Sequence, residues 1–186
     1  MTTSTESAGR AAQAPSTAPR EETPAAGREG SRAPRDGYDP LALESQVCFA
    51  LSAGARAMVA MYKPLLEPLR LTHPQYLVML ALWQDAAAGE PTTATSLADR
   101  LHLDPGTLSP LVRRLEATGY LTRSRNEHDG RVVDVTLTPA GRELRDQAEH
   151  IPPAITAATG LSLDELVEVH AAASKVVAAA LRAGVI

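Results

Sequence analysis

The segment between Thr93 and Leu137 constrains the fold of this chain more than any other segment. A short helical pattern begins after Thr93, and a tight turn follows it at His102. Asp104 is placed to cap a second helix, which has a proline at its first helical position and ends at Gly119. Two β-prone runs then flank a turn-rich stretch in residues 120–137. A short helix, a tight turn, a capped helix and a hairpin, in this order, predict a winged helix-turn-helix.

Long helical patterns lie on both sides of this segment. Apolar residues recur close to the helical period in residues 41–69, and a second helical region covers residues 139–184, with a break predicted at Pro152 and Pro153. The last helix is apolar over much of its surface, so it needs a partner to cover it. We therefore predict a mainly α fold with a small β-hairpin wing, in which residues 72–138 bind DNA and the two flanking regions dimerise.

Composition divides the chain further and limits its class. Residues 1–37 are rich in Thr, Ser, Ala, Pro and Arg and lack an apolar period, which predicts a disordered tail before a domain at residues 38–186. The net charge of −4 does not indicate general polyanion binding, so a DNA-binding interpretation depends on local pattern. Because the chain has no membrane span, no apolar leader and only one cysteine, we expect a cytoplasmic protein.

The second helix of the helix-turn-helix carries the residues that would enter a major groove. Residues near its N-terminus must be small or polar to approach the bases, and Thr107, Ser109 and Pro110 meet this requirement. Arg113 and Arg114 follow further along the helix, and arginine pairs with guanine edges or with phosphates. We expect these five residues to contact DNA.

The hairpin adds three arginines and one acid. Arg123 and Arg125 lie on its first strand, and Arg131 begins the second. A narrow minor groove attracts an inserted arginine, and we expect Arg131 to take this role with its guanidinium held by the Asp129 carboxylate. A solvated surface is the alternative for any single arginine, but the whole set in this order favours DNA binding.

These motifs together resemble the MarR family of transcription regulators. The resemblance is carried by DPGTLSPLVRRLE at 104–116, GYLTR at 119–123, DGR at 129–131 and VTLT at 135–138. The upstream motifs are similar to those of the organic hydroperoxide resistance regulators within that family, and they are QVCFAL at 46–51, YKPLL at 62–66 and LTHPQYLVMLALW at 71–83. The resemblance covers residues 40–155 well.

The resemblance implies a homodimeric transcriptional repressor in which the first and last helices of the two chains interlock. Its partner would be a pseudo-palindromic double-stranded operator beside a peroxidase gene. An organic hydroperoxide would relieve repression by oxidising the N-terminal cysteine, which is Cys48 in this chain. On this reading the protein is not an enzyme and has no cofactor.

Cys48 is the only cysteine, and a lone cysteine on an apolar helix face is usually inert. The family pattern places two hydroxyl groups at such a cysteine, and the matching positions here are Tyr62 and His73, where the family usually has a second tyrosine. Tyr62 lies roughly 21 Å from Cys48 along a straight helix at ~1.5 Å per residue. It would therefore meet the cysteine only across a dimer. His73 can donate a hydrogen bond to a thiolate and, when protonated, would favour it.

Reaction of the thiolate with a peroxide gives a sulfenic acid. Because the chain has no second cysteine, we expect a mixed disulfide with a low-molecular-weight thiol, or a sulfenamide. The added bulk would move the two recognition helices away from their spacing of about 34 Å. Glu44, the nearest charge in the sequence, would oppose the thiolate, so groups distant in the sequence or the helix N-terminus must favour it.

Three other functions remain open at this stage. The first is a MarR-type regulator that binds a small aromatic or phenolic ligand, with Cys48 incidental. The second is a thiol peroxidase, which the absence of a resolving cysteine and of a βαβ pattern disfavours. The third is a metal sensor, but the histidines are scattered without zinc-site spacing, so we expect no metal. The histidines are His73, His102, His128, His150 and His170.

Overall fold

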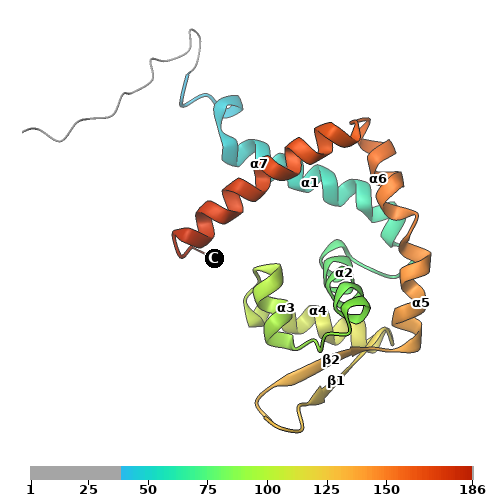
Figure 1. Ribbon diagram of the computed structural model, residues 1–186. Coiled ribbons are helices and arrows are strands. Elements are labelled where there is room, and N and C mark those ends of the chain that lie inside the picture. The colour runs from blue at the N-terminus through green and yellow to red at the C-terminus, as the bar shows by residue number, and fades with distance from the viewer. Residues whose placement is uncertain (1–38, 186) are drawn as a thin grey trace, which may run out of the picture. The chain divides into compact units, whose positions relative to one another are not determined.

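The computed structural model describes residues 39–185, so the tail predicted at residues 1–37 lies outside the described residues. The elements are η1 (Leu43–Ser45), α1 (Val47–Leu66), α2 (His73–Ala88), α3 (Ala94–Leu101), α4 (Pro105–Ala117), β1 (Leu121–Arg125), β2 (Val133–Leu137), α5 (Pro139–Ala148), α6 (Ile151–Thr159) and α7 (Leu163–Arg182). The two strands pair antiparallel with Leu121 opposite Leu137. The predicted fold class, mainly helical with a hairpin wing, is confirmed (Figure 1).

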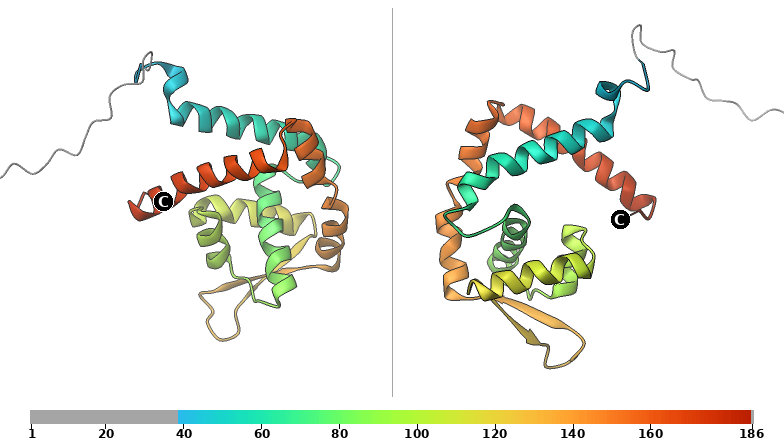
Figure 2. Two further views of the ribbon diagram at one scale, coloured as in Figure 1. Left: turned by 45° about the horizontal axis from the view of Figure 1, so that its top comes forward. Right: turned by 180° about the vertical axis from the view of Figure 1, so that it is seen from behind.

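The helices are arranged in two parts joined along one side (Figures 1 and 2). Helices α2, α3 and α4 and the β1–β2 hairpin pack together, and we call this part the reading head. Helices α1 and α7 lie at the opposite end, and α5 and α6 connect the two parts. Helix α1 contacts α2 and α6, whereas α7 makes no comparable packing with another described element.

Local side-chain chemistry fixes where the helices begin. Thr72, Thr93, Asp104 and Ser162 occupy the N-caps of α2, α3, α4 and α7, and those at Thr93 and Asp104 agree with the sequence prediction above. Thr138 caps α5 in the same way and accepts a hydrogen bond from the backbone N–H of Gly141. Such caps satisfy N–H groups that the first helical turn leaves without partners, so these boundaries depend on adjacent residues alone.

The two ends of the domain depart from the sequence prediction. The helix predicted at residues 41–69 is divided, because Gln46 is extended (φ −84°, ψ 117°) between η1 and α1, and α1 ends at Leu66. The predicted break at Pro152 and Pro153 is wrong. The chain turns at Glu149 and His150 instead, and both prolines stand in the first turn of α6, where a missing N–H costs no hydrogen bond.

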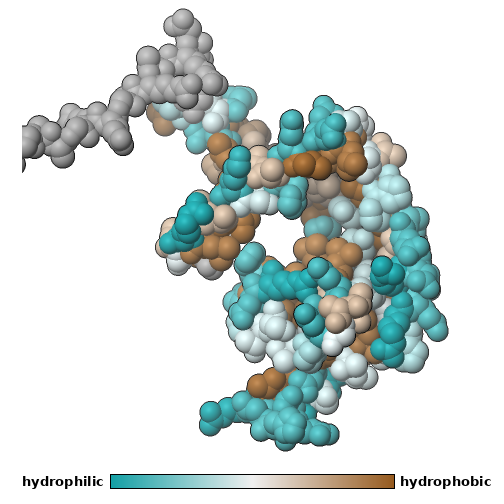
Figure 3. All heavy atoms as spheres, in the orientation of Figure 1, coloured by the Kyte–Doolittle hydropathy of each residue, from teal (hydrophilic) through white to brown (hydrophobic). Residues whose placement is uncertain are grey.

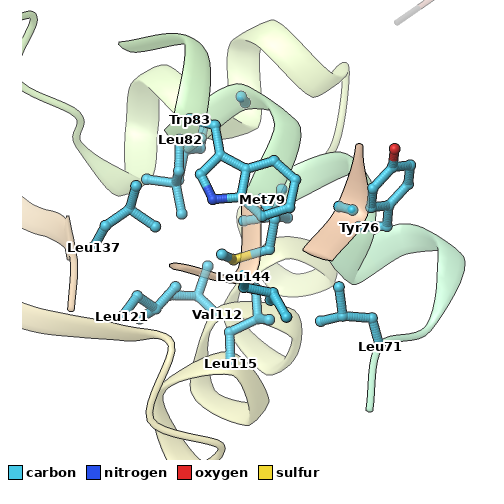
Figure 4. Packing of buried hydrophobic residues seen from close by; sticks show 14 of the residues in the cluster. Leu71, Tyr76, Met79, Leu82, Trp83, Val112, Leu115, Leu121, Leu137 and Leu144 are labelled. Carbon is cyan, nitrogen blue, oxygen red and sulfur yellow. The ribbon is translucent and has the colours of Figure 1, made fainter. Parts of the chain in front are cut away.

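The core of the protein surrounds α2. Met79 and Leu82 of this helix are fully buried against Leu115 of α4 and Leu144 of α5 (Figure 4). Burial of each such side chain contributes about 1.5–3 kcal/mol. The indole N–H of Trp83 donates to the Gly141 carbonyl oxygen at 2.8 Å, which satisfies the polar edge of this large side chain inside the core.

Gly141 lies where α5 touches the base of the wing. A Cβ atom at this position would stand 1.9 Å from the carbonyl oxygen of Tyr120, so only glycine fits. The Tyr120 carbonyl also accepts a hydrogen bond from the Thr138 backbone N–H at 3.1 Å. The end of α4, the start of β1 and the start of α5 are therefore held together at one point.

Helix α7 has no buried residue in the protomer. Its apolar side chains, together with those of η1 and α1, are exposed, and brown surface follows these helices in Figure 3. The exposed apolar residues of α7 are Leu163, Val167, Val169, Val176, Val177 and Leu181. Among the described residues, no helix is long and apolar enough to cross a membrane.

Candidate nucleic-acid interface and thiol site

Helix α4 begins at a cap that also holds one predicted DNA contact. The Asp104 carboxylate accepts the backbone N–H of Thr107 at 2.9 Å and the Thr107 hydroxyl at 2.6 Å. These hydrogen bonds, the hydroxyl first, hold the pKa of Asp104 below its usual range. Asp104 is therefore ionised at neutral pH, and Thr107 faces any ligand with its hydroxyl proton already donated to the carboxylate.

The two sides of α4 differ in exposure, as the sequence predicts. Leu108, Val112 and Leu115 are buried in the reading head. The five residues predicted to contact DNA are all exposed, and they are Thr107, Ser109, Pro110, Arg113 and Arg114. The helix thus presents its small residues and both arginines away from the core. His102 adopts a left-handed conformation (φ 52°) in the turn that precedes it.

The tip of the wing is held by an asparagine that sequence reasoning missed. The Asn126 side-chain carbonyl accepts the backbone N–H groups of His128 and Asp129 at 2.9 and 3.1 Å. Its amide donates to the Asp134 carboxylate at 3.0 and 3.1 Å. An asparagine that opens a turn-rich stretch is the sequence signal that indicates such a turn.

The arginines of the wing have different surroundings. The Arg125 guanidinium donates to the Gly130 carbonyl oxygen at 2.8 Å. Arg131 is exposed, and its backbone N–H, rather than its guanidinium, donates to Asp129 at 3.0 Å. The ion pair predicted between Asp129 and Arg131 does not occur among residues 39–185. Asp129 shapes the turn instead, because its carboxylate reaches the nearby backbone first.

Arg123 is a predicted DNA contact whose guanidinium forms an ion pair with another side chain. Its guanidinium donates to the Glu116 carboxylate through Nε at 2.9 Å and Nη2 at 2.6 Å. The backbone N–H of Arg123 donates to the second oxygen of Glu116 at 3.1 Å. The side-chain hydrogen bond from Arg123 is the main cause that lowers the pKa of Glu116. Sequence reasoning missed Glu116, because no local pattern links a helix end to the following strand.

Cys48 lies in the first turn of α1 and is exposed. The backbone N–H groups of this turn point toward the helix N-terminus and favour negative charge there. Glu44 belongs to η1, before the break at Gln46, so it does not stand one turn below Cys48 on a common helix. Glu44 and Cys48 therefore belong to separate helical segments, unlike in the continuous helix predicted from sequence.

Tyr62 and His73 lie together, and Cys48 lies apart from them. The rings of Tyr62 and His73 meet edge to face with their centroids 4.9 Å apart. Helix α1 is continuous from Val47 to Leu66, so Cys48 and Tyr62 are separated by roughly 21 Å along its axis. The structure joins the two supporting residues within one protomer, but it does not bring them to the cysteine of the same protomer.

Burial shifts the pKa values of both Tyr62 and His73. Burial raises the pKa of Tyr62 and lowers the pKa of His73. Tyr62 is therefore a neutral phenol at pH 7, and His73 is a neutral imidazole. The protonated His73 considered from the sequence is disfavoured in the protomer, which leaves hydrogen-bond donation as the chemistry available to both groups.

A groove of about 740 Å³ opens between α1 and the start of α2, beside His73. Its lining is mostly apolar, with three cationic residues and one acidic residue, which are Arg56, Lys63, Arg70 and Glu67. No group of three or more metal-ligating His, Cys, Asp or Glu side chains occurs in the part of the chain that the structure describes.

Comparison with known proteins agrees with this arrangement. A family model described as "Transcriptional regulator SarA/Rot" matches residues 60–148. The organic hydroperoxide resistance transcriptional regulator of Bacillus subtilis is 40% identical over 135 residues, which cover 73% of this chain and 89% of that protein. The chain belongs to the MarR/SarA-type transcription regulators.

Two further relatives support this assignment. The HTH-type transcriptional regulator TtmR of Methylorubrum extorquens is 43% identical over 127 residues, which cover 68% of this regulator but only 63% of the length of TtmR. The solved structure of reduced AbfR bound to DNA, a protein of Staphylococcus epidermidis, matches with a TM-score of 0.60 and 31% identity. That match covers 75% of this MarR-type regulator and 94% of the AbfR chain.

Proposed function

We propose that this regulator is a homodimeric repressor that releases operator DNA when an organic hydroperoxide oxidises Cys48. The observation that carries the proposal is the exposed Cys48 thiol in the first turn of α1, in a chain 40% identical to an organic hydroperoxide resistance regulator. Peroxides react with an accessible thiolate, and Cys48 is exposed.

The exposed side of α4 enters the major groove of the operator. Thr107, Ser109 and Pro110 approach the bases, and the guanidinium groups of Arg113 and Arg114 bind bases or phosphates. Arg131 enters the adjacent minor groove, because its side chain at the wing is exposed and has no ion-pair partner in the described part of the chain. Arg125 and Asp129 hold the wing tip in shape through their bonds to the backbone.

The dimer forms through the exposed apolar sides of α1 and α7. An apolar helix that buries nothing in its own protomer is stabilised only when another surface covers it. A second copy is the natural cover, because two reading heads at a fixed spacing match a pseudo-palindromic operator. The dimer also completes the sensor, since Tyr62 and His73 reach Cys48 only from the partner subunit.

Oxidation proceeds by attack of the Cys48 thiolate on one oxygen of the hydroperoxide. The S–O bond forms as the O–O bond breaks, and the alcohol leaves as an alkoxide that takes a proton from a neutral donor such as Tyr62 of the partner subunit. The resulting sulfenic acid then condenses with a low-molecular-weight thiol, which releases water and leaves a mixed disulfide. The bulk of this group separates the reading heads and weakens operator binding.

DNA-binding measurements with and without an organic hydroperoxide test this function. The DNA upstream of the protein's own gene is the probe, and the wild type is compared with Cys48→Ser. The wild type should lose the probe on oxidation, and Cys48→Ser should keep it. Release of DNA while mass spectrometry finds Cys48 unmodified would contradict the proposal.

The groove beside His73 favours a second candidate function. A mostly apolar lining in which three cationic residues outnumber Glu67 suits a small aromatic or phenolic ligand, whose binding would control the same reading heads while Cys48 remained incidental. The variant Cys48→Ser separates the two functions, because it loses a peroxide response but keeps a response to such a ligand.

A further inference from the structure

The pairing of Arg123 with Glu116 joins the recognition helix to the wing. Glu116 stands in the last turn of α4, and Arg123 stands in the middle of β1. Three hydrogen bonds connect them, one from the Arg123 backbone at 3.1 Å and two from its guanidinium at 2.9 and 2.6 Å. Both oxygens of the carboxylate are therefore occupied by the same residue of the wing.

In the turn between α4 and β1, backbone hydrogen bonds hold the two elements together. The N–H groups of Gly119 and Tyr120 donate to the carbonyl oxygens of Glu116 and Leu115 at 2.9 and 3.0 Å, which ends the helix. These bonds lie at one end of β1, so they act as a pivot. The Glu116–Arg123 pair lies two residues further along the strand and fixes the angle at which the hairpin leaves the helix.

Arg123 is exposed, but its guanidinium is held by Glu116. It lines a cavity of about 240 Å³ between α3 and α4, together with Leu108, Ser109 and Val133. To reach a phosphate, Arg123 would have to leave Glu116 and expose a free carboxylate beside the DNA backbone. Arg113, Arg114 and Arg131 have no such partner among the described residues.

We propose that Arg123 and Glu116 are positioning residues that set the wing at a fixed angle to α4, so that major-groove and minor-groove contacts form together. The proposal rests on the proposed operator binding by α4 and the wing. An exposed ion pair adds little to the stability of a fold. The pair is 31% and 35% exposed, so its loss should affect the wing angle more than folding.

The salt dependence of operator binding distinguishes a positioning residue from a phosphate contact. A phosphate contact contributes about 0.9 to the slope of log K against log salt concentration. A positioning residue contributes to affinity but leaves that slope unchanged. The sign of the effect at Glu116 is a second criterion. If Arg123 is a DNA contact that Glu116 holds away from the DNA, removal of the Glu116 charge strengthens binding. If the pair sets the wing angle, removal of that charge weakens binding.

The experiment measures operator affinity over a range of salt for the wild type, Glu116→Gln, Arg123→Met and the double variant. Methionine keeps the apolar stem of Arg123 over the cavity, and glutamine keeps the shape of Glu116. We expect each single variant to bind roughly ten-fold more weakly with the wild-type slope. The double variant should bind no more weakly than Arg123→Met, because both changes break the same bridge.

Arg114→Met provides the matched control, because Arg114 is exposed on α4 and should lower the slope by about 0.9. A lower slope for Arg123→Met, or tighter binding by Glu116→Gln, would overturn the proposal. If the wild type fails to bind the operator at all, the proposed function itself is wrong, so the two failures are distinct. Thermal unfolding confirms that each variant is folded, and Glu116→Gln decides the outcome should Arg123→Met not fold.

Discussion

The reading head and α7 place their apolar side chains in opposite ways. In the reading head, Val78, Leu97 and Leu115 are at most 1% exposed within one protomer. In α7 no residue is buried, and Val176 is 44% exposed. The reading head buries its apolar side chains within one protomer, whereas those of α7 stay exposed in the protomer.

The two halves of the proposed function therefore depend on different equilibria. The shape of the DNA-binding surface follows from intramolecular packing, so it does not change with protein concentration. The thiol site as we propose it takes groups from two chains, so on this proposal it exists only when the chains associate.

A charge on the apolar side of α7 should separate the protomers. Val176→Glu would place a carboxylate in the proposed dimer interface, where its desolvation opposes association. We expect a monomer by sedimentation and a loss of operator affinity of roughly 10²–10⁴-fold, because two linked reading heads bind far more tightly than one. The control Glu168→Gln alters an exposed polar residue of the same helix and should remain dimeric. A dimeric Val176→Glu protein would remove α7 from the interface.

Truncation of a buried leucine in the reading head should act on the protomer itself. Leu115→Ala removes a side chain that is 0% exposed, and the cavity it leaves should lower the free energy of unfolding by about 3 kcal/mol. The matched change on α7 is Leu181→Ala, at a leucine that is 43% exposed. Chemical unfolding at two protein concentrations should show a concentration-dependent loss only for Leu181→Ala. The same dependence on protein concentration in both variants would show that the stability of the reading head also depends on association of the chains.

Loss of the wing arginine should weaken DNA binding without affecting folding. Arg131→Ala removes an exposed guanidinium, and we expect operator affinity to fall by about 1–3 kcal/mol if this side chain enters the minor groove. Fluorescence anisotropy with a labelled operator measures the change. The exposed His128, at the same hairpin tip, supplies the control His128→Ala. An unchanged affinity for Arg131→Ala would place the minor-groove contact elsewhere.

Acid should destabilise the protomer slightly through His73. Burial lowers the pKa of this imidazole, so the unfolded chain binds a proton more readily than the folded chain. Its contribution to stability is therefore present above the unfolded pKa of about 6.5 and is lost as pH falls below that value. His73→Gln should show a smaller drop in melting temperature between pH 7 and pH 5 than the wild type. An equal drop would mean that His73 does not titrate in this window.

Local signals in the sequence predict the reading head well. The caps at Thr72, Thr93 and Asp104 involve only neighbouring residues, and the structure confirms them. A break is predicted at Pro152 and Pro153 because proline ends helices, but proline also stands in the first turn of a helix, as both do in α6. The sequence signal is the same in both cases. No distinctive local signal marks the division at Gln46. The apolar periodicity therefore predicts one continuous helix where the structure has η1 and α1.

Sequence reasoning missed one contact between separate elements and misassigned one contact within the wing turn. Glu116 has an ordinary position at the end of a helix, and only the path of β1 brings the Arg123 guanidinium onto it. Asp129 was predicted to hold the Arg131 side chain, but it binds the backbone N–H of Arg131 instead. The roles of the DNA-contacting residues, Cys48, Tyr62 and His73 stay predictions, because they depend on molecules other than this chain.

The single tryptophan gives this protein a built-in optical probe. Trp83 is 6% exposed, and its indole N–H reaches from α2 to the Gly141 carbonyl of α5, at the junction between the reading head and the connecting helices. Because indole emission shifts when its hydrogen bond or its access to water changes, any movement of α5 against α2 alters the spectrum of the unlabelled chain. Stopped-flow fluorescence can therefore time the structural response to an inducer directly, and compare it with the release of DNA.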